Sequence, residues 1–272
     1  MSVRIIGSAT PKALVKYAYM PLDGNIALSD AKADQTKLGQ AITQLISQAG
    51  LTTKNVAVGI PSSKVFTTVA DVDRLSKDEL ARAIRYQADA LIPTPLAESK
   101  IDWALLGDSP ADKTKVEILL SSVTNKFVED RLDMLEAIGL NVIAFEPDNL
   151  ALARALLVTD APGAQLVLDM GQKSTDLVIT MAGTPRLTRA IPTGLEAVVR
   201  SAAQNLSVDE KQASQFVMKF GLSKEKLEGQ VVQAISGTIE LLESEIEKSI
   251  KFFQTRYQGV NVEKIVVTGG AS

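Results

Sequence analysis

A polar turn between two apolar segments is the part of the sequence best suited to chemistry. Residues 166–179 read LVLDMGQKSTDLVI, with Gly171 at the start of the turn. A tight glycine turn directs backbone N–H groups at one centre, and Ser174 and Thr175 add hydroxyl donors. Asp169 suits a hydrated Mg²⁺, because magnesium binds carboxylate oxygens and keeps much of its water. The pattern favours a phosphate-binding turn.

Two further observations bear on this interpretation. The turn is no Walker loop, since it lacks GK[ST] and no helix is expected to follow. An ordinary hairpin, whose Asp, Gly and Ser residues only form the turn, accounts for the same letters. A predicted strand at 264–268, however, ends in Gly269 and Gly270. Ligands of open α/β sheets bind at the carboxyl ends of strands, so the second glycine turn favours a binding site.

Composition removes many kinds of chemistry. The sequence contains no cysteine and no histidine. Disulfides, thiolate zinc sites, cysteine nucleophiles and histidine-based triads or metal sites are therefore excluded. The formal net charge of −3, without a basic block, argues against nucleic-acid binding. No apolar run reaches the ~20 residues of a spanning helix, and the first residues lack a signal-peptide pattern, so we expect a cytoplasmic protein.

The elements that must position the turn follow from apolar periodicity. Strands alternate with helices along the 272 residues, which is typical of an α/β fold of about two domains. A long amphipathic helix at 231–257 precedes the strand at 264–268. The other predicted elements outside a middle region are a hairpin at 3–6 and 14–20, a helix at 34–48 ended by Gly50, a strand at 56–60, a helix at 125–138, a strand at 141–145 and a helix ending at 157.

The middle region, residues 62–120, indicates an inserted small β-α-β-β subdomain. Strands are predicted at 65–69, 100–106 and 115–122. Ser76 and Glu79 have the spacing of a capping box, which begins a helix that Pro93 ends.

Three parts of the chain resemble the PilM family, the actin-like proteins of type IV pilus assembly, which are relatives of the cell-division protein FtsA. Together with the order of helices and strands between them, they extend the resemblance over nearly the whole chain. The part within residues 75–103 is the most specific for this family, because the glycine turns of the other parts fit any actin-like ATPase. The similar segments are LSKDEL at 75–80, AIRYQA at 83–88, IPTPL at 92–96 with Asp102 and Trp103, LDMGQKSTDL at 168–177, IPTGLE at 191–196, EKSIKFF at 247–253 and VTGG at 267–270.

The resemblance implies an actin-like (ribonuclease H-like) α/β fold of two duplicated lobes. Residues 1–61 and 121–160 form the first lobe, 62–120 the insert and 161–272 the second lobe, with Mg-ATP in the cleft between lobes. The residues that it assigns to ATP binding are Asp169, Gly171, Ser174, Thr175, Asp176, Gly194, Gly269 and Gly270, with Asp169 on Mg²⁺ through water, and Glu245, Lys248 and Ser249 near adenosine. A solvated charged helix face accounts equally well for those last three residues.

The family pattern also predicts that this sequence is truncated. Family members begin with a strand and an Asp-Ile-Gly turn that forms the first phosphate loop, whereas Val3 to Ile6 matches the strand after it. They also continue beyond the Thr-Gly-Gly turn, whereas this sequence ends at Ser272. We therefore expect the chain by itself to bind ATP weakly or not at all.

The function that the resemblance implies is a scaffold on the cytoplasmic face of the inner membrane. It would dock the tail of a PilN-like membrane protein, link that protein to pilus motor ATPases and allow self-association, with at most weak ATPase activity. Ile92 and Leu96 of the insert are the predicted partner-binding residues, in an apolar groove that takes a peptide segment. A place in the core of the insert is the alternative for them.

Two other functions fit the same fold class. A small-molecule kinase needs a catalytic carboxylate near the γ-phosphate, and Glu146 is the candidate, although its neighbour Pro147 equally suggests the start of a helix. A filament-forming division protein like FtsA is the second alternative. The IPTPL and Asp-Trp segments favour the pilus function.

Overall fold

The computed structural model describes residues 2–6, 13–157 and 161–271, which fold as two compact units. The first unit combines the chain up to Ile60 with Thr94–Lys100 and Val123–Glu146. The second combines Pro61–Pro93, Ile101–Ser122 and the chain from Pro147. The division predicted from the sequence, into two lobes and an insert at 62–120, is not the same as these two units and stays a prediction.

The first unit contains two strand pairs and the helices that cover them. β1 pairs antiparallel with β2, as predicted, and β3 is bonded to β7. The predicted turn of the first hairpin, at 7–11, falls in part of the chain outside the described residues. The elements are β1 (Ser2–Ile6), β2 (Ala13–Ala18), α1 (Gly24–Leu28), α2 (Lys32–Ala49), β3 (Asn55–Ile60), η2 (Leu96–Glu98), α4 (Asn125–Ala137) and β7 (Asn141–Pro147).

The core of the first unit lies where α2 and α4 meet the β3 and β7 strands. Met134 and Leu135 of α4 are buried there with Leu140, against Leu38 and Ile42 of α2. These two α2 residues are one helical turn apart and therefore share a face. Gly50 ends α2 in the left-handed conformation, with a φ of 60°, which confirms the predicted stop.

The part of the second unit that comes from the predicted insert is a three-stranded sheet with one helix. Its strand order is β4-β6-β5, and β4 runs antiparallel to β6. Ser76 and Glu79 form the predicted capping box at the start of α3. The elements are η1 (Ser62–Lys64), β4 (Phe66–Asp73), α3 (Lys77–Leu91), β5 (Ser99–Asp108) and β6 (Lys115–Thr124).

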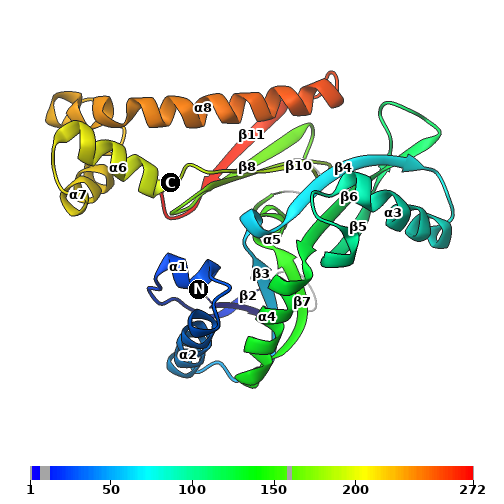
Figure 1. Ribbon diagram of the computed structural model, residues 1–272. Coiled ribbons are helices and arrows are strands. Elements are labelled where there is room, and N and C mark those ends of the chain that lie inside the picture. The colour runs from blue at the N-terminus through cyan, green and yellow to red at the C-terminus, as the bar shows by residue number, and fades with distance from the viewer. Residues whose placement is uncertain (1, 7–12, 158–160, 272) are drawn as a thin grey trace. The chain divides into compact units, whose positions relative to one another are not determined.

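The rest of the second unit is built on a four-stranded mixed sheet of order β10-β9-β8-β11. Figure 1 labels β8, β10 and β11 of this sheet, below α8 in the view. β8, β9 and β10 form an antiparallel meander, and β11 lies parallel to β8. The elements are α5 (Asp148–Leu156), β8 (Ala164–Met170), β9 (Thr175–Met181), β10 (Thr184–Ile191), α6 (Leu195–Leu206), α7 (Glu210–Phe220), η3 (Lys226–Gly229), α8 (Gln230–Arg256) and β11 (Val262–Thr268).

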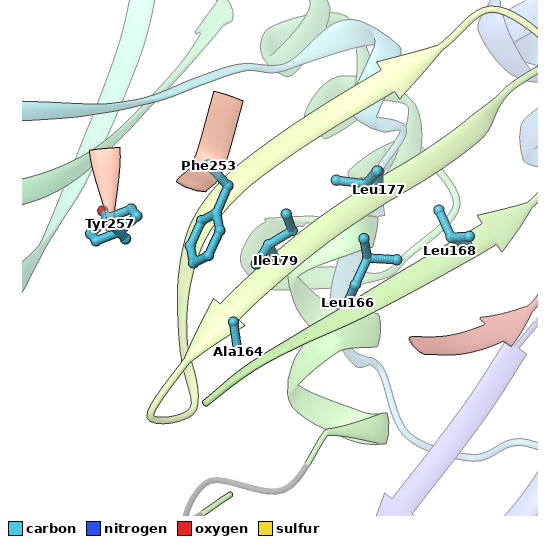
Figure 2. Packing of buried hydrophobic residues seen from close by; sticks show 7 residues of the cluster. All are labelled: Ala164, Leu166, Leu168, Leu177, Ile179, Phe253 and Tyr257. Atoms are coloured by element: carbon cyan, nitrogen blue, oxygen red, sulfur yellow. The ribbon is translucent and has the colours of Figure 1, made fainter. Parts of the chain in front are cut away.

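One face of this sheet packs against α8. Leu166 and Leu168 of β8 and Leu177 of β9 pack in one cluster with Phe253 of α8 and with Tyr257, the residue that follows α8 (Figure 2). Residues two apart on a strand share a face, as residues four apart do on a helix. Burying a large apolar side chain contributes about 1.5–3 kcal/mol, so this cluster fixes β8 and β9 and hence the turn between them.

Neither β10 nor α7 is predicted by the residue pattern. Pro185 and Arg186 are poor strand signals, and a register shift between Pro185 and Leu187 accommodates the proline on this edge strand. α7 buries only Ala213 and Val217 in its length, so its apolar stripe is narrow. Among the helices that the structure describes, none combines the length and apolar composition needed to cross a bilayer.

Candidate phosphate-binding site

The predicted phosphate turn joins the ends of β8 and β9. Antiparallel pairing places Asp169 opposite Asp176. Gly171 N–H donates to Ser174 O at 2.9 Å and closes the turn. The N–H groups of Gln172 and Ser174 donate to no backbone carbonyl within the described part of the chain. The turn therefore offers unused backbone donors, as an anion-binding turn requires.

The first residues of helix α6 are hydrogen-bonded to carbonyl groups of the turn. Leu195 N–H donates to Gly171 O at 3.0 Å, and Glu196 N–H donates to Gln172 O at 2.9 Å. The first amides of α6 are thus bonded to the turn, so the donors left for a ligand are those of the turn itself. Gly194 precedes them, and a Cβ there would lie 2.7 Å from Gln172 O and from Gly171 O.

Thr175, the first residue of β9, forms a hydrogen bond within the protein. The residue is fully buried, and its Oγ1 donates to Thr193 O at 2.7 Å. Its hydroxyl hydrogen is therefore used to fasten the segment before α6, and the expected contact of Thr175 with a phosphate stays a prediction. Ser174 is half-buried, so of the two hydroxyls its own is the accessible one.

The second predicted glycine turn meets the first. β11 places Thr268 beside Asp169, and Ala271 N–H donates to Met170 O at 3.0 Å. Gly269 has a φ of +102°, and a Cβ there would lie 2.5 Å from Asp169 Oδ1. A Cβ on Gly270 would meet nothing within 4 Å, so this residue faces open space. The structure thus brings the two glycine turns together at Asp169.

Three carboxyl groups near this point are destabilised in their charged form. Burial raises the pKa of Asp169, and burial together with the Asp169 charge raises the pKa of Asp176. Asp148, although partly in solvent, has its pKa raised to about 6 by desolvation first and then by the charge of Asp176. A cation would relieve this repulsion. Among the described residues, however, no group of three such side chains is arranged as a direct metal-ligand set.

The three α8 residues assigned to adenosine are bonded elsewhere. Ser249 is 1% exposed, accepts from Arg189 Nη1 at 3.2 Å and donates to Glu245 O at 2.7 Å. Glu245 forms ion pairs with Arg189 of β10 and with Lys248. These contacts fasten α8 to the edge of the sheet, which matches a structural role for Ser249 and a charged helix face for the other two.

The remaining predicted residues lie in other parts of the chain. Ile92 is a core residue, only 7% exposed, so the alternative place in the core of the insert is the one it takes. Leu96 begins η2 and is half-buried. Glu146 is half-buried near the end of β7, in the first unit.

Two pockets bear on the site. A small apolar pocket of about 110 Å³ touches Gly194 and Thr175 and is lined by Leu195, Ile239 and Leu242. A larger one, about 790 Å³, lies between α2 and α4 in the first unit. We place the candidate site at the glycine turns, because the unused donors and the carboxylates are there.

Sequence reasoning missed Ser62 and Asp148. Ser62 Oγ donates to Asp176 Oδ1 at 2.5 Å, and Ser62 N–H donates to Asp148 Oδ1 at 3.0 Å. Asp148 is thus one of the three carboxyl groups near the glycine turns, and Ser62 is hydrogen-bonded to two of them. The available signal was weak: each follows a proline, Pro61 and Pro147, just after a strand.

Comparison with known proteins bears on identity. A family model described as type IV pilus assembly protein PilM matches residues 5–272. A solved PilM-PilN type IV pilus biogenesis complex is 22% identical over 99% of this chain and 78% of that chain, with a TM-score of 0.82. MreB5 of Spiroplasma citri bound to ADP is 14% identical over 97% of this chain and 69% of that one, at a TM-score of 0.47. The ethanolamine utilization protein EutJ from Carboxydothermus hydrogenoformans is 18% identical over 71% and 60%, at 0.43.

The family model spans nearly the whole chain, and the backbone agrees with that of the solved PilM over the same length. The fold is therefore the actin-like α/β fold predicted from the sequence. With the paired glycine turns in the expected positions, the chain belongs to the family of type IV pilus assembly protein PilM.

Proposed function

We propose that this chain is a nucleotide-binding scaffold of the type IV pilus machinery that docks the tail of a PilN-like membrane protein. The observation that carries the proposal is the family match over residues 5–272, since the solved relative is a PilM-PilN complex. The match favours this function over the kinase and the FtsA-like alternatives. On this proposal the chain reaches the inner membrane through its partner, and a link to pilus motor ATPases stays a prediction.

The residues at the glycine turns fit Mg-ATP. Gln172 and Ser174 would bind phosphate oxygens through their backbone N–H groups, and the Ser174 hydroxyl adds a donor. Asp169 would hold a water of the magnesium ion. When bound, Mg²⁺ supplies positive charge that offsets both the phosphates and the neighbouring carboxylates. Contacts of the nucleoside with Glu245, Lys248 and Ser249 stay a prediction.

Nucleotide binding is tested by Asp169→Ala in this chain and, because weak binding by the chain itself is expected, also in a longer protein of the family that contains it. Removing this carboxylate should weaken Mg-ATP binding roughly tenfold or more, because a charged hydrogen-bond acceptor of the hydrated metal is lost. Isothermal titration calorimetry measures the affinity, and circular dichroism checks that the fold is kept. The control is Asp73→Ala, which removes an exposed carboxylate from the end of β4. If Asp169→Ala binds Mg-ATP with the same affinity as the control, the turn is an ordinary hairpin and not a phosphate-binding turn.

Docking of the partner is tested at Leu96. A fluorescent peptide with the sequence of a PilN-like cytoplasmic tail should bind the chain, and Leu96→Glu should weaken it roughly tenfold, because a charge replaces apolar contact area. Fluorescence anisotropy measures the affinity. Leu105→Glu is the matched control, since Leu105 is an exposed leucine of β5. If both variants bind the peptide as the unchanged chain does, Leu96 has no part in docking.

A further inference from the structure

Ser62 links two carboxyl groups that are far from it in the sequence. It is the first residue of η1 and is 8% exposed. Its N–H donates to Asp148 Oδ1 at 3.0 Å, and its Oγ donates to Asp176 Oδ1 at 2.5 Å. All three residues belong to the second unit. Ser62 therefore uses its N–H to bind the beginning of α5 and its hydroxyl hydrogen to bind the beginning of β9.

The two carboxylates have few other donors. Asp148 Oδ1 also accepts from Asn149 N–H at 2.7 Å. For Asp176, the Ser62 hydroxyl is the side-chain donor within the described part of the chain. Asp176 is half-buried, and a carboxylate in such a place needs a donor to compensate for lost water. Its repulsion from Asp169 and Asp148 adds to that need.

The orientation of Asp176 matters because of what lies opposite. Side chains directly opposite on an antiparallel pair have their Cβ atoms about 4.5–5.5 Å apart, and Asp169 is opposite Asp176. Left to themselves, two carboxylates at this separation turn away from each other. The bond from Ser62 to Oδ1 restricts the rotation of the Asp176 carboxyl group, while Asp169 lies opposite it on β8. Magnesium is commonly bound by one or two carboxylates, directly or through water.

We propose that Ser62 is a positioning residue of the nucleotide site, holding Asp176 in the orientation from which it and Asp169 bind the waters of the magnesium ion. The inference rests on the proposed nucleotide binding and adds a residue outside both glycine turns. Ser62 itself does not touch the nucleotide. It acts through Asp176, so its loss should change the dependence of ATP binding on magnesium.

The test compares three variants of the full chain. Ser62→Ala removes the hydroxyl but keeps the N–H that bonds Asp148, and Ser62→Thr keeps the hydroxyl. Ser63→Ala is the matched control, because Ser63 is the exposed next residue of η1. ATP binding is measured by calorimetry at increasing free Mg²⁺, and thermal unfolding is followed for each variant. Ser62→Ala should need roughly tenfold more Mg²⁺ for half-maximal binding, equivalent to about 1.4 kcal/mol.

Each outcome decides the matter. Ser62→Thr should return the Mg²⁺ requirement to within about threefold of the unchanged chain, and Ser63→Ala should leave it as it is. If Ser62→Ala binds ATP with an unchanged Mg²⁺ requirement, the inference is wrong while nucleotide binding stands. The inference is also wrong if Ser62→Ala loses ATP binding and Ser62→Thr does not restore it. It is equally wrong if the loss of binding is explained entirely by a lower unfolding temperature of Ser62→Ala. If neither the unchanged chain nor a longer protein of the family that contains it binds Mg-ATP, the proposed nucleotide binding fails, and the inference fails with it.

Discussion

At the scale of single residues, the candidate site depends on a close approach of backbone to backbone. Gly194 lies where the segment before α6 passes the phosphate turn, and the carbonyl oxygens of Gly171 and Gln172 come within 2.7 Å of where a Cβ would be. The backbone of Gly194 is extended, with a φ of −131°, so any residue could adopt its conformation. What requires glycine here is space, and the two hydrogen bonds from α6 to the turn depend on it.

A pair of identical substitutions tests this requirement. Gly194→Ala should destabilise the fold by about 1–3 kcal/mol, because the methyl group displaces the turn from α6. Gly237→Ala in α8 should stabilise it by about 0.5–1 kcal/mol, since a Cβ there meets nothing within 4 Å and alanine favours a helix. Urea unfolding measures both free energies. Changes of the same sign in the two variants would contradict the role assigned to Gly194.

At the scale of elements, one buried carboxylate joins three of them. Glu117 of β6 is 1% exposed and accepts from Arg186 of β10 at 2.7 Å, and from Arg256 Nε of α8 at 2.7 Å. Tyr257 donates its hydroxyl hydrogen to Glu117 at 2.9 Å, and burial followed by the carboxylate raises the pKa of Tyr257 to about 12. Arg256 also bonds Asp71 of β4. The sheet of the predicted insert is thereby tied to β10 and α8.

Removing the central carboxylate should loosen this connection. Glu117→Ala leaves the buried Arg186 without its ion pair, and we expect a loss of about 3–5 kcal/mol in unfolding free energy. The control is Glu129→Ala, which breaks an exposed pair with Lys100 and should cost about 0–1 kcal/mol. Urea unfolding followed by circular dichroism compares them. A Glu117→Ala loss no larger than that of Glu129→Ala would show that the network adds nothing to stability.

At the scale of the whole molecule, the two proposed activities fall on different compact units. The glycine turns and Asp169 belong to the second unit, whereas Leu96 belongs to the first. Each unit has buried clusters of its own. The two tests under the proposed function should therefore separate: Asp169→Ala should keep tail binding, and Leu96→Glu should keep the affinity for Mg-ATP. Loss of both activities in either variant would show that one cooperative structure carries them.

The sequence by itself determined the local features. The capping box of Ser76 and Glu79 and the glycine stop at Gly50 involve residues within a few positions of each other, so their hydrogen bonds are written in short patterns. Periodicity likewise predicted α8 and the strands on both sides of the phosphate turn, because their apolar residues repeat with the period of the element. The family resemblance added the actin-like fold.

Only the tertiary structure decided which of the polar residues form the site. The Ser62 hydroxyl meets Asp176 across a separation of 114 residues, and no local pattern encodes a bond between segments so far apart. The burial of Thr175 and Ile92, and the pairing of Glu245 with Arg189, also follow from which elements pack together. A sequence pattern gives the face of an element on which a residue lies. The neighbour that covers this face sets the residue's donors, its solvent and its charge, and these are what make a binding residue.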